Sequence, residues 1–335
     1  MSKRRLSKHQ KSRITEKQQR EIEAVTYSQF NNANNNNSNC NGRIISHFGK
    51  QLDVEVLNKN GPPRTVRCHQ RANLPDLVTG DLVVWDQESG ESGVIVAVNE
   101  RQNLFARPDA AGNLKPVAAN IDIVLIVFAV MPEPFMNLID RYLVAVDNLG
   151  LEPLLVFNKI DLLNEQNSDE FNSILSIYEE LGYPVQRVSA LTGRGIAELE
   201  EALSVKTTVF VGQSGVGKSS LVNRLGLAEM TDVADLSQKK YKGTHKTTTA
   251  RLFHLRNCDV IDSPGIREFH LGHITQTELL SGFRELNELA GNCKFRDCSH
   301  QTEPDCAIQE ALIAGKIFPQ RLENYFKILQ MMETP

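Results

Sequence analysis

The feature that most constrains the fold is the segment 207–219, which reads TTVFVGQSGVGKS. A strand-like apolar run ends in the pattern G-x-x-x-x-G-K-S, and a helix-like run over 220–225 follows. Glycines let backbone N–H groups surround phosphate oxygens, and the positive end of the following helix faces the same anion. A plain glycine-rich turn is the alternative, which these flanking elements disfavour. The expected phosphate-binding residues are Gly212, Gln213, Ser214, Gly215, Val216, Gly217, Lys218, Ser219 and Ser220.

A second set of residues, earlier in the chain, is suited to recognising guanine. Asn158, Lys159 and Asp161 follow the apolar run 154–157, and ligands bind at such strand ends in open α/β sheets. The Asp161 carboxylate only accepts hydrogen bonds, so it matches the paired N1–H and N2–H donors of guanine, which adenine lacks. Taken alone, this segment could also be a solvated turn after a strand.

The sequence RVSA over 187–190 supplies the other half of a guanine pocket. The Ala190 N–H could meet guanine O6, and Ser189 would shape the turn. Neither segment is specific by itself, but together they predict a site for a guanine nucleotide.

Several residues are expected to contact Mg²⁺ and the γ-phosphate. Lys218 would reach the β- and γ-phosphates, and the Ser219 hydroxyl would bind Mg²⁺. In the later sequence DSPG, Asp262 would place a carboxylate near Mg²⁺, and the N–H of Gly265 would sense the γ-phosphate. These residues predict hydrolysis chemistry as well as binding.

A polar segment over 242–249 is expected to be a mobile switch. It contains Thr247 and Thr248, and one of these threonines would close on Mg²⁺ when GTP is bound. We assign Thr248 to Mg²⁺ together with Ser219, although the sequence leaves open which threonine serves. A surface loop is the alternative for either threonine taken singly.

The order of these motifs is unusual for a GTPase. Ordinary small GTPases carry the phosphate loop first and the base-reading segments last, whereas here the order is NKID, VSA, phosphate loop, switch threonines, DSPG. Moving the chain ends to a surface loop leaves every strand-end contact in place. The order therefore predicts a circularly permuted GTPase domain, in which the segment after DSPG leads directly into the C-terminal region.

A cluster of cysteines and a histidine near the C-terminus predicts a structural zinc site. Cys293, Cys298, His300 and Cys306 have the spacing C-x4-C-x-H-x5-C, and three thiolates with one imidazole make a closed tetrahedral Zn²⁺ site. A disulfide or unrelated buried thiols are the alternatives. No signal peptide is visible, so a reducing cytoplasm favours metal over disulfide. The longest apolar run, 123–131, is too short to span a bilayer, so we expect no membrane association.

Charge is distributed unevenly along the chain. The 335 residues include 37 Lys+Arg and 41 Asp+Glu, for a net charge of −4. Residues 1–20 hold eight Lys/Arg and one Glu, which leaves 29 basic and 40 acidic residues elsewhere. A short basic tail commonly adds phosphate contacts to RNA, although a merely solvated tail is the alternative. The Asn-rich stretch 31–41 then reads as a flexible linker.

Residues 42–108 have the pattern of a small β-barrel. Five or six short alternating strands separated by turn residues favour an OB-fold, which commonly binds oligonucleotides on one face. A plain barrel with a solvated basic edge is the alternative, and Trp85 is expected in its core. The basic residues expected on or beside one strand are Arg64, Arg67, His69 and Arg71.

Beyond residue 120, strands alternate with helices and predict a mostly parallel sheet, and helical runs dominate after residue 277. We therefore expect a disordered basic tail and linker (1–42), an OB-fold RNA-binding domain (43–110), a circularly permuted α/β P-loop GTPase domain (111–276) and a helical zinc-binding domain (277–335).

The combination of barrel, permuted motifs and Cys/His cluster resembles the ribosome small-subunit-dependent GTPase A family over residues 43–332. The resemblance implies a cytoplasmic bacterial GTPase that binds GTP and GDP, binds the 30S subunit and its 16S rRNA, and acts late in subunit maturation with hydrolysis stimulated there. One departure is visible. The family's switch resembles G-x-H-T-T-T, whereas this chain has Lys246 between His245 and Thr247.

The usual motif does not supply the group that orients the attacking water. Many GTPases place a Gln after the DxxG glycine, but here that residue is Ile266, which cannot position water. We hypothesise that His245 serves when the switch is ordered on the ribosome, because histidine titrates near neutrality; a structural or RNA-contact role is the alternative. A GTP-gated RNA-binding adaptor with incidental hydrolysis is the other functional class, and an ATPase is disfavoured by Asp161. No self-association pattern is evident, so we expect a monomer.

Overall fold

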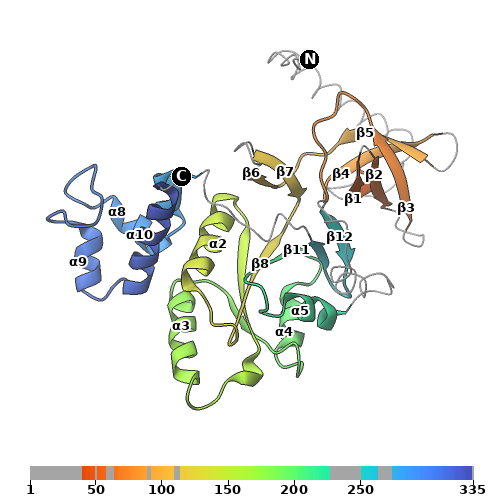
Figure 1. The fold of residues 1–335 in the computed structure, drawn as a ribbon. Coiled ribbons are helices and arrows are strands. Elements are labelled where there is room, and N and C mark those ends of the chain that lie inside the picture. Colours follow the sequence, from red (N-terminus) through yellow and green to blue (C-terminus); the bar gives the residue numbers. More distant parts are fainter. Residues whose placement is uncertain are drawn as a thin grey trace, which may run out of the picture.

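The computed structural model describes residues 40–49, 51–57, 64–88, 92–108, 114–226, 250–262 and 274–333. These residues form a β-barrel, an α/β domain and a helical C-terminal unit, which follow one another along the chain (Figure 1). The basic tail, most of the Asn-rich stretch and the expected switch segment 242–249 lie outside the described residues.

The barrel consists of β1 (Gly42–Phe48), β2 (Gln51–Val56), β3 (Thr65–Gln70), β4 (Leu82–Gln87) and β5 (Ser92–Val98). The strands pair in the order β1-β2-β3-β5-β4, and β4 also pairs with β1, so the sheet closes on itself. Only β3 and β5 run parallel, as expected for a five-stranded Greek-key barrel of the OB type. Alternating residues fill the interior, and Trp85 lies in the barrel core as predicted.

A two-stranded hairpin lies between the barrel and the α/β domain. It consists of β6 (Leu104–Pro108) and β7 (Leu114–Ala119), which pair with each other and with none of the barrel strands. The sequence predicts β6 but not β7, whose Pro116 weakens any strand signal. The side chains of Phe105 and Ala118 pack into the core of the α/β domain, so this hairpin is attached to that domain through apolar contacts.

The α/β sheet has the strand order β10-β9-β8-β11-β13-β12. All neighbours in it are parallel except β12 and β13, which confirms the predicted mostly parallel sheet. The strands are β8 (Ile123–Ala129), β9 (Glu152–Asn158), β10 (Val185–Arg187), β11 (Thr207–Val211), β12 (Arg251–His254) and β13 (Asp259–Asp262). The barrel continues this sheet, because β1 pairs with β12 at Ser46 and Arg251.

Helices cover both faces of the sheet because its central strand is buried on both sides. All seven residues of β8 are buried, and its alternate side chains enter two separate cores. One core packs against α2 (Met136–Asn148) and α3 (Ser168–Glu180), and the other against α4 (Ile196–Ala202) and α5 (Lys218–Leu225) (Figure 1). The result is a three-layer α/β domain.

The helical unit contains α7 (Gln276–Ser281), α8 (Arg284–Ala290), α9 (Ala307–Ile313) and α10 (Pro319–Glu333). A capping box between Thr275 and Glu278 starts α7. An apolar core around Phe283 and Tyr325 holds the helices together and includes Val144 of α2. The unit is therefore docked directly on the α/β domain.

Buried polar contacts reinforce this docking. Arg321 of α10 donates to Asp140 of α2 at 2.5 Å and to Glu285 of α8 at 2.7 Å. Asp140 also accepts from Asn324 at 2.6 Å and from the hydroxyl of Tyr178 at 2.9 Å. One buried ion-pair network thus links α2, α3, α8 and α10.

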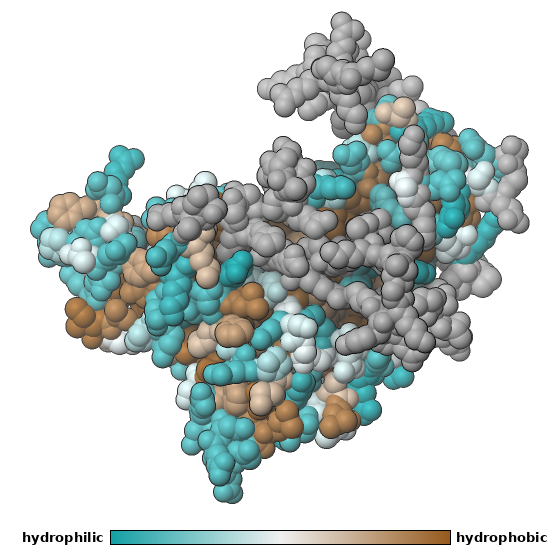
Figure 2. Space-filling model, in the orientation of Figure 1, coloured by the Kyte–Doolittle hydropathy of each residue, from teal (hydrophilic) through white to brown (hydrophobic). Residues whose placement is uncertain are grey.

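On the face shown in Figure 2, apolar side chains occur in patches among hydrophilic ones. In the part of the chain that the structure describes, none of the helices is both long and apolar enough to span a membrane.

Candidate functional site

The predicted nucleotide-binding residues meet at one edge of the α/β sheet. The phosphate loop follows β11, the NKID sequence follows β9, Ser189 and Ala190 follow β10, and Asp262 ends β13. These four strands are parallel, so their carboxyl ends share the edge where open α/β sheets bind ligands. Chain order does not affect this arrangement, because each motif is attached to its own strand.

The phosphate loop requires glycine at two positions. Gly212 has φ 132°, and a Cβ there would lie 2.0 Å from the carbonyl oxygen of Val127 on the neighbouring strand. Gly217 has φ 98°, and a Cβ there would lie 2.3 Å from Nδ2 of Asn158. Both conformations strain any L side chain, so the glycines of the G-x-x-x-x-G-K-S pattern are needed for the loop to fold against β8 and β9.

The Lys218 ammonium lies over the phosphate loop. It donates to the carbonyl oxygens of Gly212 and Gln213, each at 2.6 Å. Lys218 is also the first residue of α5, whose amino end follows the loop directly. A cation and a helix amino terminus therefore converge at the place where the sequence predicts phosphate.

The NKID sequence is bonded to the phosphate loop. Asn158 is buried at the end of β9, where its Nδ2 donates to the Val216 carbonyl at 2.8 Å and its Oδ1 accepts from the Ala190 N–H at 3.1 Å. Lys159 has a left-handed backbone (φ 63°), and its Nζ donates to the Gly215 carbonyl at 2.7 Å. Asn158 thus joins both base-reading segments and the phosphate loop in one hydrogen-bond network.

The predicted guanine-reading carboxylate is held by Ser189. The Ser189 hydroxyl donates to the carboxylate of Asp161 and accepts from the Thr192 N–H at 3.1 Å. Ser189 is buried, whereas Asp161 is exposed at the sheet edge. The Ala190 N–H bonds to Asn158 here, so its expected role toward guanine O6 stays a prediction.

The residues expected to respond to the γ-phosphate are described only in part. Asp262 ends β13, which lies beside the strand of the phosphate loop. His245, Thr247, Thr248 and Gly265 lie outside the described residues. The proposed water-orienting group and switch threonines therefore stay predictions.

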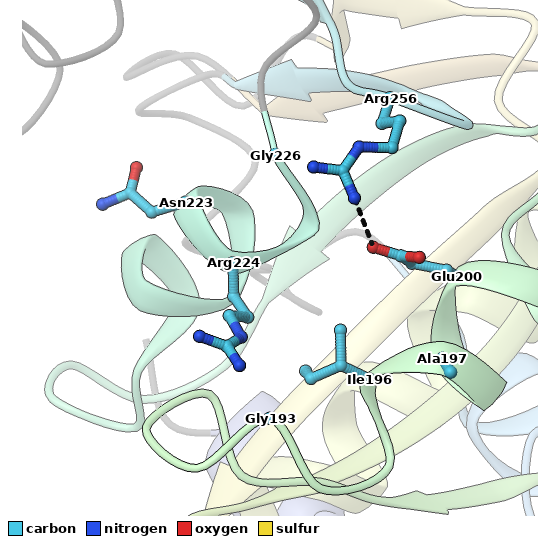
Figure 3. A pocket seen from close by; sticks show the side chains of 8 residues that line it. All are labelled: Gly193, Ile196, Ala197, Glu200, Asn223, Arg224, Gly226 and Arg256. Atoms are coloured by element: carbon cyan, nitrogen blue, oxygen red, sulfur yellow. Dashed lines mark ion pairs between the residues drawn. The ribbon is translucent and has the colours of Figure 1, made fainter.

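An open cavity is lined mainly by residues of α4 and α5 (Figure 3). Its volume is about 520 Å³, and Arg256 on one wall lies 3.9 Å from Glu200. None of the predicted nucleotide-binding residues lines this cavity. Its lining residues are Gly193, Ile196, Ala197, Glu200, Asn223, Arg224, Gly226 and Arg256.

The Cys/His cluster has the dimensions of a tetrahedral zinc site. The Cys293 and Cys306 sulfurs lie 3.9 Å apart, and His300 Nδ1 lies 3.5 Å and 3.6 Å from them. Ideal Zn–S and Zn–N bonds give S···S of about 3.8 Å and S···N of about 3.6 Å. The ligand atoms of all four residues, Cys298 included, lie within 4.8 Å of one another. The donor set therefore fits Zn²⁺.

The other three cysteines take no part in this cluster. Cys68 and Cys258 are buried in the barrel and in the α/β domain, and burial raises the pKa of both thiols to about 11. Burial likewise raises the pKa of the Cys40 thiol to about 11. These three thiols therefore stay protonated at neutral pH.

A polar cluster between the barrel and the α/β domain was not predicted from the sequence. We call it the interdomain cluster, and His254 is at its centre, with Nδ1 2.6 Å from Asp259 and Nε2 2.9 Å from Glu55. Its residues are Arg43 and Glu55 of the barrel and Thr207, His254 and Asp259 of the α/β domain. Arg43 and Asp259 are 216 positions apart, so no local pattern could have paired them.

We predict that His254 stays doubly protonated far above neutral pH. Its hydrogen bonds to Asp259 and Glu55 raise the pKa to about 10, against burial, which lowers it. Because the folded value exceeds the unfolded value of about 6.5, its stabilising contribution is complete below pH 6.5 and disappears as the pH rises through 10. NMR titration of the His254 ring should give a midpoint near 10. A midpoint near 6.5 would contradict the observed bonding.

Comparison with known proteins agrees with the fold and the motif order. The family model described as RsgA GTPase matches residues 98–272. A protein of Azotobacter vinelandii named "Small ribosomal subunit biogenesis GTPase RsgA" is 52% identical over 88% of this chain and 86% of its own. One of the same name from Pseudomonas syringae pv. tomato is 53% identical over 86% of this chain and 84% of its own.

Two solved structures share the fold over most of the chain. YjeQ from Thermotoga maritima superimposes with a TM-score of 0.72 at 32% identity, covering 88% of this chain and 98% of that one. YloQ, described as a circularly permuted GTPase, gives a TM-score of 0.69 at 27% identity, covering 87% and 94%.

The fold and the motif order define a circularly permuted P-loop GTPase with an N-terminal barrel and a C-terminal Cys₃His cluster. Within that class, the chain belongs to the RsgA GTPase family.

Proposed function

We propose that this protein is a GTPase that binds the 30S ribosomal subunit and acts in its late maturation, with hydrolysis stimulated by the subunit. The curated relatives are named for small ribosomal subunit biogenesis. The single observation that supports guanine-nucleotide binding is that Asn158 forms hydrogen bonds with both Val216 and Ala190. These bonds join motifs that are far apart in the sequence into one site.

In this site, the phosphate loop binds the GTP phosphates and Lys218 neutralises their charge. Ser219 and Thr248 bind Mg²⁺, with Asp262 nearby, and the Gly265 N–H responds to the γ-phosphate. Mg²⁺ supplies charge neutralisation when it is bound. His245 orients the attacking water once the switch is ordered on the subunit.

We predict that Asp161→Asn weakens GTP binding by about 10–100-fold. The variant loses a charge-assisted acceptor worth about 1.5–3 kcal/mol and faces the guanine N1–H and N2–H with an amide. Because Asn can still accept the Ser189 hydroxyl bond, the pocket should keep its shape. Competition against labelled GTP measures the change, and XTP, which carries an oxygen in place of the N2 amine, should compete better than it does with the wild type. Unchanged GTP affinity would exclude Asp161 as the base reader.

The Cys₃His cluster holds a single structural Zn²⁺. All four ligands are protein side chains, which leaves no open position for catalysis. We predict one zinc per chain by elemental analysis, and a strongly reduced content for Cys306→Ser. Cys258→Ser, which changes a buried thiol outside the cluster, is the matched control and should retain one zinc. Equal zinc contents in the two variants would refute the site.

The barrel and the C-terminal unit bind 16S rRNA. On β3 the side chains of Thr65, Arg67 and His69 are exposed, whereas Val66 and Cys68 point into the barrel. Arg67 and His69 therefore lie on the same face of β3. Arg64 and Arg71 are exposed on either side of this strand, and the basic tail adds sequence-independent phosphate contacts.

We further propose that the protein is a cytoplasmic monomer divided into a tail (1–42), barrel domain (43–110), GTPase domain (111–276) and zinc domain (277–335). The proposed function is tested by co-sedimentation with 30S subunits in GDP and in a non-hydrolysable GTP analogue. We expect binding in the analogue to be at least tenfold tighter. Equal binding in both nucleotides, or equal binding to 50S subunits, would contradict it.

A further inference from the structure

The barrel contacts the α/β domain at the amino ends of two strands of the phosphate site. Arg43 of β1 donates from Nη1 to Asp259 Oδ2 at 2.5 Å and from Nη2 to Thr207 Oγ1 at 2.7 Å. Thr207 and Asp259 are register partners and the first residues of β11 and β13. One barrel side chain therefore bridges both strands.

The opposite ends of the same two strands carry phosphate-site residues. β11 continues into the phosphate loop, and β13 ends at Asp262, three residues beyond Asp259. At about 3.3 Å per residue, the Arg43 contact lies about 10 Å from the Asp262 backbone along a single strand. One short strand thus joins the Arg43 contact to the Asp262 backbone.

Further barrel contacts reach the β12–β13 hairpin. Glu55 of β2 bonds to His254 at 2.9 Å, and His254 in turn bonds to Asp259. The buried Thr79 hydroxyl donates to the carbonyl of Ala250, immediately before β12, at 3.0 Å. Ser46 pairs with Arg251 of β12. The β12–β13 hairpin, which follows the expected switch segment 242–249 in the chain, is held by the barrel at several points.

The contacting groups are well placed to transmit movement. The side chains of Arg43 and Glu55 are only 13% and 16% exposed, so water screens them weakly. Two cationic and two anionic groups face one another, so the cluster is balanced in charge. Among the described residues, the barrel pairs with the α/β sheet through β12 and with neither base-reading strand, β9 or β10.

We propose that Arg43 is a positioning residue that couples the barrel to the phosphate side of the nucleotide site, through Asp259 and β13. Subunit docking on the barrel then acts on hydrolysis, and the bound nucleotide acts on the barrel. The kinetic part of this inference rests on the proposed function. The structural part does not.

The structural part is tested by hydrogen exchange of the full chain, without ribosomes. Amides of β1 and β2 should exchange at different rates in GDP and in a non-hydrolysable GTP analogue, and this difference should disappear in Arg43→Ala. Arg284→Ala is the matched control, because it removes an arginine–carboxylate pair, Arg284–Asp147, that lies outside the barrel and involves none of the predicted nucleotide-binding residues. Barrel amides that are insensitive to the nucleotide in the wild type, or a difference that survives in Arg43→Ala, would overturn the proposal.

The kinetic part is tested by GTP turnover with and without 30S subunits. Arg43→Ala should lower the 30S-stimulated kcat about tenfold, with the KM for GTP and the turnover without subunits within threefold of wild type. Arg43→Lys, which keeps the charge but cannot bridge two acceptors in the same way, should recover part of the loss. If Arg43→Ala also raised the KM for GTP and lowered the turnover without subunits about tenfold, Arg43 would be a merely structural residue. That result would overturn the assignment.

Failure of the proposed function would be distinguishable from failure of this inference. If the wild type shows no stimulation by 30S subunits while its barrel amides still respond to nucleotide through Arg43, the proposed function fails and the coupling stands.

Discussion

Replacing Arg321 with methionine is expected to lower the free energy of unfolding by about 3–5 kcal/mol. The Arg321 and Asp140 side chains are both 0% exposed, and their ion pair measures 2.5 Å. Methionine keeps most of the side-chain volume but leaves the Asp140 carboxylate buried without its cation. Breaking one side of a buried pair costs far more than losing an exposed one, because the remaining charge cannot be solvated.

The loss should also depend on pH. Burial raises the pKa of the Asp140 carboxyl, and Arg321 counteracts that rise. Without Arg321 the folded-state pKa rises further above the unfolded value, so the folded protein binds the extra proton and its stability falls as the pH increases. Urea unfolding should therefore show a larger deficit at pH 8 than at pH 5.

The control for this prediction is in the same helix. Lys327 forms an exposed pair with Glu323, and Lys327→Ala should change stability by less than about 0.5 kcal/mol. A deficit below about 1 kcal/mol for Arg321→Met at both pH values would show that the network contributes little to the docking of the helical unit.

Replacing Lys218 with alanine is expected to weaken GTP binding at least about 100-fold. Two charge-assisted contacts to the β- and γ-phosphates, at about 1.5–3 kcal/mol each, would be lost. Calorimetric titration with a non-hydrolysable GTP analogue measures this effect. Lys316→Ala, which removes an exposed lysine of the helical unit, should leave the affinity for GTP unchanged. Binding by Lys218→Ala within threefold of wild type would mean that the phosphates lie elsewhere.

The nucleotide-binding motifs were predictable because each one is local in sequence. The phosphate loop combines a strand, a turn that requires glycine at Gly212 and Gly217, and a helix, all within 19 consecutive residues from 207 to 225. The permuted order could be inferred because parallel strands bring their carboxyl ends together whatever their order along the chain. The Cys₃His cluster was equally predictable, because its spacing is short and its side chains are chemically distinctive.

Contacts between the three parts of the chain were not predictable. Arg321 and Asp140 are 181 positions apart, and Arg43 and Asp259 are 216 apart. In both cases an ordinary arginine becomes important only because the tertiary fold buries it beside a carboxylate. Strand β7 was missed for a local reason, since Pro116 lowers its strand propensity while pairing with β6 supplies the missing stabilisation.

The barrel and the helical unit both pack on the α/β domain (Figure 1). The barrel holds the amino ends of β11 and β13 through Arg43, and the helical unit packs on α2 through Arg321 and the apolar core around Phe283. The chain passes from the DSPG sequence directly into that helical unit. The barrel is thus linked to the two strands that carry the phosphate loop and Asp262, whereas the helical unit is linked to α2.

GTP turnover by the purified protein, alone and with 30S subunits, 50S subunits or 70S ribosomes, tests this account most directly. The account predicts slow turnover by the free protein and a large increase with 30S subunits only. Equal rates with and without 30S subunits would contradict it and favour an RNA-binding adaptor whose GTP hydrolysis is incidental.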